Sequence, residues 1–230
     1  MARELINPFE VLIYRASVND SGEARIAATL CLTIFEQFHA TLCLIDNGFA
    51  THAPGPIRSM LEGLADLVNL TNQPAYLNQL HYENAAENIK LFREYAALPG
   101  QENEVTQKLE YWKQQAEQVK HELAEKVNKG LKTRDKLDKA GLIEQYVTYR
   151  VLCGFIHPNM TSLIARHADV QPILRYRDAA APEVITMLLD ITVELLGHAV
   201  QTLPRFTDLT VDDIETAVAD AKQQWELAAE

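Results

Sequence analysis

Cysteine is scarce in this sequence. The 230 residues include three, Cys31, Cys43 and Cys153, and they form no Cys-x-x-Cys pair. All three lie within apolar helical patterns, where small buried thiols are common. The pattern predicts reduced, structural cysteines in a reducing compartment. A chain of this length can bury a substantial core without a disulfide or a structural metal.

Signals for export and for membrane insertion are also missing. The first ten residues carry acidic side chains and Pro8 instead of a basic segment followed by an apolar run, so we expect no secretory signal. The longest apolar region, residues 26–45, is interrupted by Glu36, Gln37 and His39. A buried core helix explains it better than a membrane span. We therefore expect a cytoplasmic protein with no membrane contact.

Positive charge is in deficit, with 32 acidic residues against 21 lysines and arginines and a formal net charge of −11. The average field of such a protein repels nucleic acid, so phosphate binding needs a local basic patch. One basic stretch lies at residues 126–139, and its candidate RNA contacts are Lys126, Lys129, Lys132 and Arg134. A solvated helix surface is the alternative interpretation.

Motifs for several common chemistries are absent. No Gly-rich phosphate loop and no Gly-x-Ser-x-Gly elbow occurs, so phosphate-loop nucleotide hydrolysis and α/β-hydrolase chemistry have no support. Glu36-x-x-His39 has di-iron spacing, but such centres need a second pair, and the sequence offers none. Glu194 and His198, four residues apart, suit an ordinary exposed pair. We expect no metal and no cofactor.

The sequence is rich in apolar residues spaced three and four apart, the signature of amphipathic helices. An all-α helical bundle is the predicted fold, as a single domain over residues 1–230. Asn47-Gly48 and Pro54 to Pro56 are a helix-ending and a helix-starting signal. We expect the helices at 23–47 and 182–204 to be the most buried, because they are apolar around most of their circumference. Helices are predicted at 3–17, 23–47, 55–72, 75–97, 102–129, 141–157, 182–204 and 211–228, and only residues 173–177 favour an extended segment.

Two consecutive predicted helices carry narrow apolar seams. In each, the spacing alternates between four and three on an otherwise polar helix, which predicts a single packing partner. A short turn, Leu98 to Gly100, joins them, so residues 75–129 should form an antiparallel hairpin that projects as an arm. The seam residues are Tyr82, Ala85, Ile89, Phe92 and Ala96, then Val105, Leu109, Trp112, Ala116, Val119 and Leu123.

The segment from Tyr146 to Pro158 carries the candidate catalytic residues. Arg150 and His157 are seven residues apart, nearly two helical turns, so they share a face with Tyr146. Pro158 should stop the helix directly after His157. An imidazole beside a guanidinium suits acid-base work on a phosphate. In the structural alternative, Arg150 pairs with a buried carboxylate and His157 bonds a carbonyl at the helix end.

A second polar series, Arg58, Glu62 and Asp66, occupies successive i, i+4 positions beside an apolar stripe. A structural ion-pair network is the favoured interpretation. Alternatively, Glu62 contacts Arg150 or His157 and orients that side chain without touching the substrate itself. Gly63 within the same helix indicates close approach of another helix.

Arg-x-x-x-Glu on one helix, a charged helical arm and a Tyr-rich helix ending in His-Pro resemble a bacterial all-helical family of unknown function, over residues 53–162. Arg150-x6-His157 also resembles the Arg-x4–6-His motif of HEPN domains (higher eukaryotes and prokaryotes nucleotide-binding). That second resemblance implies a dimeric, metal-independent ribonuclease of toxin or phage-defence type, with Arg150 and His157 as its catalytic pair. Those domains usually carry a polar residue after the arginine, whereas this chain has Val151.

Two functions therefore remain open. The first is a ribonuclease-like or RNA-binding homodimer, favoured by the shared face of Tyr146, Arg150 and His157. The second is a non-catalytic module that binds a protein partner through the hairpin, favoured by the acidic net charge and Val151.

Overall fold

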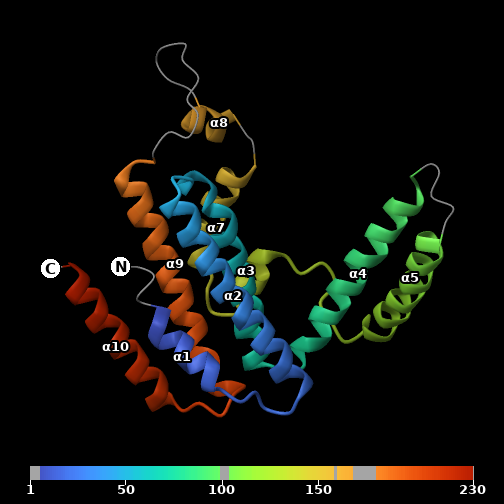
Figure 1. Cartoon of the computed structure of the whole chain (residues 1–230). Helices are drawn as coiled ribbons and strands as arrows, with labels where there is room; N and C mark the ends of the chain where they lie inside the picture. The colour runs from blue at the N-terminus through green and yellow to red at the C-terminus, as the bar shows by residue number, and fades with distance from the viewer. Residues whose placement is uncertain (1–5, 99–103, 158–159, 168–179, 230) are drawn as a thin grey trace. The chain divides into compact units, whose positions relative to one another are not determined.

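The protein is almost entirely helical, as the sequence predicts. The computed structural model describes residues 6–98, 104–157, 160–167 and 180–229. Helix makes up 81% of the structure. The predicted extended segment at 173–177 lies outside the described residues. The α-helices are α1 (Asn7–Arg15), α2 (Gly22–Asp46), α3 (Pro54–Asn72), α4 (Tyr76–Ala96), α5 (Glu104–Leu123), α6 (Thr133–Lys139), α7 (Gln145–Ile156), α8 (Met160–His167), α9 (Pro182–Thr202) and α10 (Val211–Ala229) (Figure 1).

The chain divides into two compact units. The first, called the bundle below, comprises Met1–Asn72 together with Thr133–Glu230. The second, called the hairpin, is Gln73–Lys132 and contains α4 and α5. Each unit has buried apolar residues of its own.

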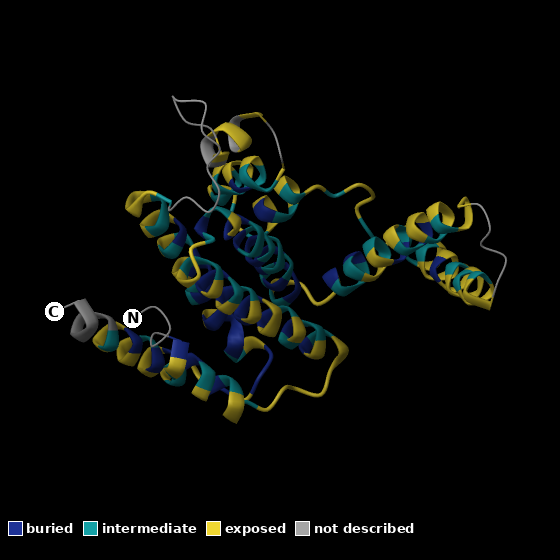
Figure 2. Cartoon of the chain, turned by 45° about the horizontal axis from the view of Figure 1, so that its top comes forward, coloured by how far each residue is buried: buried dark blue, intermediate teal, exposed yellow. Residues whose placement is uncertain are grey.

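α3 is the central helix of the bundle. It packs against α2, α9, α7 and α6, which cover it on several sides. Eight residues of α2 and seven of α9 are buried, and among the described helices only α3 buries more, with nine (Figure 2). The expectation that the helices at 23–47 and 182–204 would be among the most buried is confirmed, while α3, which packs against four helices, is buried further. The fully buried residues of α3 are Ile57, Met60, Leu61, Leu64, Ala65 and Leu67.

α2 packs against α3 at Gly63, but not so closely that a glycine is required there. A Cβ at this position would lie 3.5 Å from Cγ1 of Ile34 on α2, an ordinary van der Waals distance. α2 is also long and apolar enough to cross a membrane by length and composition alone, a test that the core helix of a soluble protein passes as well. Its contacts with α3 and α9 are those of a core helix.

α1 and α10, the first and last helices of the bundle, pack against each other. An isolated antiparallel bridge joins Val18 to Thr207, just before α10. Thr210 and Asp213 form a capping box at the start of α10: the Asp213 N–H donates to Oγ1 of Thr210 at 3.2 Å, and the Thr210 N–H donates to Oδ2 of Asp213 at 2.8 Å. Arg15 of α1 also pairs with Asp213. These bonds fix where α10 begins.

In the hairpin, α4 and α5 run antiparallel through the predicted seams. Phe92 and Trp112 have ring centroids 6.4 Å apart. Ala85, Ile89 and Ala116 form a buried cluster. Residues later in α4 therefore contact residues earlier in α5, so the two helices run in opposite directions (Figure 1).

Two predicted boundaries were wrong. The helix predicted at 102–129 ends at Leu123, and the one predicted at 141–157 begins at Gln145, with the short α6 before it. Gly130 and Gly141 have φ of +77° and +73°, a left-handed conformation that an α-helix cannot contain. α6 lies between these two glycines, in residues 130–140 where no helix was predicted.

Candidate functional site

Arg150 and His157 both lie on the side of α7 opposite its buried residue, Leu152. Arg150 is exposed, and its guanidinium donates a hydrogen bond to the Tyr146 phenol, which raises the pKa of Arg150. His157 is exposed and is the residue after the last helical one. Its backbone is extended (φ −80°, ψ 136°), the conformation that a following proline enforces. Seven residues correspond to a rise of about 10 Å along α7.

Two stacked tyrosines sit beside Arg150 on α7. The rings of Tyr146 and Tyr149 have centroids 6.0 Å apart and planes 18° apart. The Arg58 guanidinium of α3 lies over the Tyr149 ring at 5.3 Å, and that of Arg134 on α6 lies over Tyr146 at 5.7 Å. We call these five residues, Arg58, Arg134, Tyr146, Tyr149 and Arg150, the tyrosine–arginine cluster.

Tyr149 is the inner ring of the cluster. Partial burial raises its pKa, and the Cys153 hydrogen bond and the nearby Glu62 carboxylate raise it further. The hydroxyl of Thr133 donates to it at 3.4 Å and works in the opposite direction. With its pKa above the ordinary value for tyrosine, the Tyr149 phenol is neutral at physiological pH.

The predicted Arg58, Glu62, Asp66 series divides between two partners. Arg58 donates from Nε and Nη2 to Oε1 of Glu62, at 3.1 and 2.9 Å. Partial burial lowers the pKa of Arg58, but this ion pair outweighs the burial and the net shift is upward. Asp66 turns instead to Lys136 of α6, with Oδ1 3.0 Å from Nζ. Glu62 thus orients Arg58 beneath the tyrosines, and Asp66 fastens α6 to α3.

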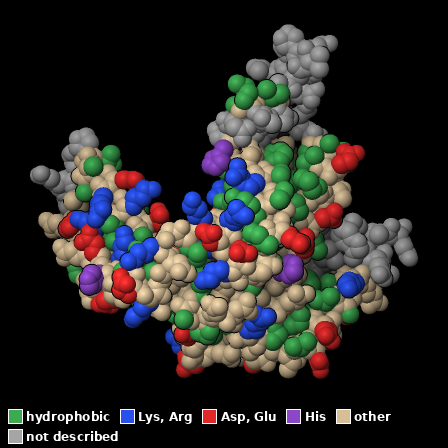
Figure 3. Space-filling view, turned by 180° about the vertical axis from the view of Figure 1, so that it is seen from behind, with side chains coloured by type: hydrophobic (Ala, Val, Ile, Leu, Met, Phe, Trp, Pro, Cys, Tyr) green, Lys and Arg blue, Asp and Glu red, His purple; other side chains and the backbone are tan. Residues whose placement is uncertain are grey.

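Arg134 and Arg150 are the two exposed cations of the cluster. Among the residues that the structure describes, neither has a carboxylate partner. The buried ion pair that was the structural alternative for Arg150 is not seen in this part of the chain. Figure 3 shows Lys and Arg side chains gathered on one face of the molecule, beside a band of hydrophobic side chains. Two unneutralised guanidinium groups can bind an anion such as a phosphate.

The other predicted RNA contacts belong to the second unit. Lys126, Lys129 and Lys132 follow α5 in the hairpin, and Lys129 pairs with Glu125 at 3.4 Å. Only Arg134 of the four predicted contacts joins the cluster.

Sequence reasoning missed Tyr149 and Thr133. The spacing of three between Tyr146 and Tyr149 was a usable signal, because such positions are neighbours on a helix. No signal pointed to Thr133, since α6 itself was missed.

The sequence spaces His39 from Glu36 as in di-iron centres, but His39 pairs with a residue of another helix, and Glu194 and His198 form the ordinary pair that was expected. Nε2 of His39 lies 2.9 Å from Oε1 of Glu10 on α1, and His198 lies 3.8 Å from Glu194. Within the described ranges, no group of three or more His, Cys, Asp or Glu residues could hold a metal ion.

A family model matches residues 24–171, and its description is a family of unknown function (DUF5677). The chain belongs to this family. No curated protein and no solved structure matches the chain. The part matched to DUF5677 contains the whole tyrosine–arginine cluster and His157. Membership in DUF5677 carries no activity, so the relationship to HEPN domains stays a prediction.

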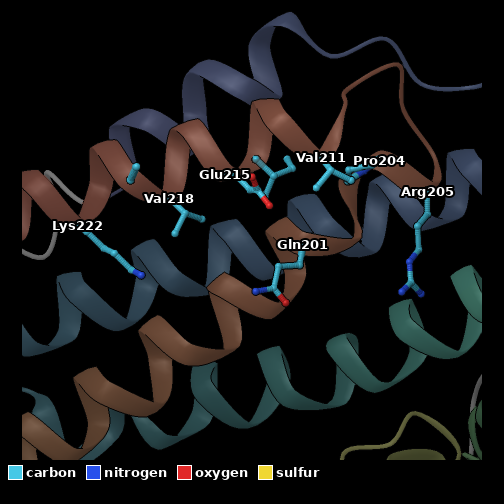
Figure 4. Close-up of a pocket in the computed structure, with 9 residues that line it drawn as sticks. Gln201, Pro204, Arg205, Val211, Glu215, Val218 and Lys222 are labelled. Atoms are coloured by element: carbon cyan, nitrogen blue, oxygen red, sulfur yellow. The ribbon is translucent and has the colours of Figure 1, made fainter.

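A groove of about 630 Å³ between α9 and α10 lies outside the part of the chain matched to DUF5677 (Figure 4). Its lining mixes apolar Val211 and Val218 with charges of both signs, Glu215 and Lys222. Arg205, at one end of it, donates to the side chain of Asn72. With its charges opposed, this groove is a weaker candidate for anion chemistry than the tyrosine–arginine cluster.

Proposed function

We propose that the tyrosine–arginine cluster binds the phosphodiester backbone of RNA, and that Arg150 and His157 cleave it in a homodimer without a metal. The observation that carries this proposal is the pair Arg134 and Arg150. Their guanidinium groups are exposed, held against Tyr146, and without a carboxylate partner among the described residues. With RNA as its substrate, the protein is expected to act in the cytoplasm.

Binding follows from the geometry of the cations. A guanidinium presents a fork of N–H donors that matches two oxygens of one phosphate. The contact of Arg134 with the Tyr146 ring and the hydrogen bond from Arg150 to its phenol restrict both side chains before RNA arrives. Restricted cations lose less conformational entropy when they bind.

Cleavage uses the ribose 2′-hydroxyl, which DNA lacks. Its oxygen attacks phosphorus, its proton passes to a base, and the 5′ oxygen leaves with a proton from an acid. The products are a 2′,3′-cyclic phosphate and a free 5′-hydroxyl. An imidazole can serve in either transfer, and Arg150 stabilises the added charge on phosphorus. Each chain has one His157, so the His157 of a second copy supplies the second proton-transfer group.

A non-catalytic interaction module is the second candidate. Val147 and Val151 of α7, which line a groove against α9, are 70% and 47% exposed. Exposed β-branched residues on a solvent-facing helix favour contact with another protein.

The test measures binding and cleavage separately on labelled single-stranded RNA, with DNA of the same sequence as a reference. We expect Arg134→Ala and Arg150→Ala each to weaken RNA binding and to reduce the slope of log affinity against log salt by about one. Arg25→Ala on α2 is the matched control, because it removes an exposed arginine outside the cluster. His157→Ala should keep RNA binding and abolish cleavage.

Cleavage should persist in excess chelator and leave the cyclic phosphate. If RNA binds but is never cut by the wild type, the catalytic half of the proposal fails and RNA binding stands. If folded wild-type protein binds RNA no better than the double variant Arg134→Ala, Arg150→Ala, the whole proposal fails and the interaction module takes its place.

A further inference from the structure

One face of the hairpin is almost without charge. α5 has seven Lys and Glu residues among its 20. A groove of about 380 Å³ nevertheless runs between α4 and α5, and among the described residues that line it His81 is the one with an ionisable side chain. The lining residues that matter here are Asn84, Asn88, Phe92, Trp112, Gln115 and Val119.

Two ion pairs of the hairpin lie on other sides of these helices. Arg93 of α4 pairs with Glu117 of α5 at 3.4 Å, and Lys113 pairs with Glu110 at 3.0 Å. None of these four residues lines the groove. The hairpin therefore has a charged side closed by ion pairs and an amide-and-aromatic side that is open.

The open side leaves large apolar groups in water. The buried cluster of the hairpin consists of Ala85, Ile89 and Ala116, and small residues make up two of the three. Trp112, which lines the groove, is 52% exposed, and Tyr111, the residue before it on α5, is 59% exposed. Two helices cannot cover such a face by themselves, because each has only the other to pack against.

We propose that the hairpin of a second copy of this chain covers the groove. The two hairpins pack face to face as a four-helix bundle, with α5 of one copy antiparallel to α5 of the other. Charge placement argues for this occupant. Gln115 lies midway between Lys108 and Glu122, seven residues from each and on the groove side of α5. With a two-fold axis through Gln115, Lys108 of one copy meets Glu122 of the other, twice. A C2 interface requires this kind of self-complementarity.

The same axis pairs the remaining groups suitably. Tyr111 and Val119 are each four residues from Gln115, so the phenol ring of one copy covers the valine of the other. Asn88 lines the groove next to Ile89, which shares a cluster with Ala116, so Asn88 lies at about the level of Gln115. An amide both donates and accepts hydrogen bonds, so Asn88 and Gln115 can each bond their own symmetry mates. One central polar layer of this kind sets the register of a helical interface.

Size and net charge agree with self-association at this face. Helices of 20 residues are about 30 Å long, and two side by side about 20 Å wide, which gives roughly 600 Å² per copy and reaches the lower range of specific interfaces. Each copy carries a net charge of −11, so two copies repel each other least where each surface carries little net charge. This inference concerns the hairpin and does not depend on RNA binding by α7.

The test is sedimentation equilibrium of the full chain with charge reversals. We expect a dimer for the wild type at about 100 µM. Lys108→Glu and Glu122→Lys should each weaken dimerisation about tenfold, and the double reversal should restore it. Gln115→Glu should weaken it further, because it places two carboxylates on the axis. Lys90→Glu, an exposed residue of α4 that does not line the groove, is the control and should change the dissociation constant by less than about twofold.

Circular dichroism must show unchanged helix content in every variant. A wild type that is monomeric at 100 µM overturns the proposal. So does a dimer that Gln115→Glu and both single reversals leave intact, since its interface then lies elsewhere. Failure of the double reversal to restore a dimer lost in both singles refutes the antiparallel register.

Discussion

α3 and α5 are helices of nearly equal length, 19 and 20 residues, in opposite surroundings. α3 buries nine residues among four neighbouring helices, while α5 buries Ala116 alone against α4. Apolar residues at helical spacing produced a core helix in one case and a half-covered helix in the other. The number of neighbours, more than the seam itself, decides how much water each helix excludes. We therefore expect amide hydrogen exchange to be slower in α3 than in α5.

The largest effect should come from truncating the centre of α3. Leu64 is fully buried, so Leu64→Ala should cost roughly 2–5 kcal/mol of unfolding free energy. Trp112→Ala removes a larger side chain from the hairpin but should cost on the order of 1 kcal/mol, because about half of that side chain is already in water. Urea unfolding, at protein concentrations too low for the chain to dimerise, measures both losses of unfolding free energy. Equal losses would show that the hairpin is as tightly packed as the bundle.

Ion pairs give a second, smaller contrast. The side chains of Lys136 and Asp66 are 16% and 18% exposed, whereas those of Arg93 and Glu117 are 66% and 44% exposed. Removing one partner of a nearly buried pair leaves a poorly solvated charge, so Asp66→Ala should cost roughly 2 kcal/mol. Glu117→Ala should cost less than about 1 kcal/mol.

Salt provides the control for this comparison. High salt should weaken the Arg93–Glu117 pair and leave the Lys136–Asp66 pair largely unaffected, because buried pairs are screened less. If 1 M salt reduced the cost of Asp66→Ala as strongly as that of Glu117→Ala, the two pairs would be equivalent.

Local patterns predicted the hairpin better than the α6–α7 region. The seams from Tyr82 to Phe92 and from Trp112 to Val119 repeat over several turns, and repetition averages out single exceptions. The segment around α6 is short, and its turns depend on the conformations of Gly130 and Gly141, which periodicity does not report. The central place of α3 was equally hidden, since the sequence does not show how many helices surround one helix.

The candidate site was partly predictable for the same reason. The common face of Tyr146, Arg150 and His157 follows from helical spacing alone. The placement of Arg58 and Arg134 over the tyrosine rings brings α3 and α6 to α7, and contacts between elements are set by packing. A single sequence could therefore provide the row of residues on α7 but not the cations that flank it.

The smallest expected effect concerns helix starts and depends on pH. Hydrogen bonds from Thr210, through its N–H and its hydroxyl, together with the ion pair to Arg15, hold the pKa of Asp213 at about 2, below its ordinary value of 3.8. A carboxyl whose folded pKa is lowered contributes stability that is fully present above its unfolded pKa. This contribution disappears as pH falls from about 4 towards 2, where the folded group is protonated as well.

Asp213→Asn should therefore lower the melting temperature of the bundle at pH 7, and the gap to the wild type should narrow as pH falls through this window. Asp212→Asn is the matched control, a first-turn acid of the same helix, and we expect it to give a smaller gap. In the hairpin, α4 begins after Ala75 without a side-chain cap, so its amide exchange should show no corresponding change between the two proteins. A gap for Asp213→Asn that stayed constant from pH 7 to pH 2 would mean that the lowered pKa does not contribute to folding, and that the cap acts through its neutral hydrogen bonds alone.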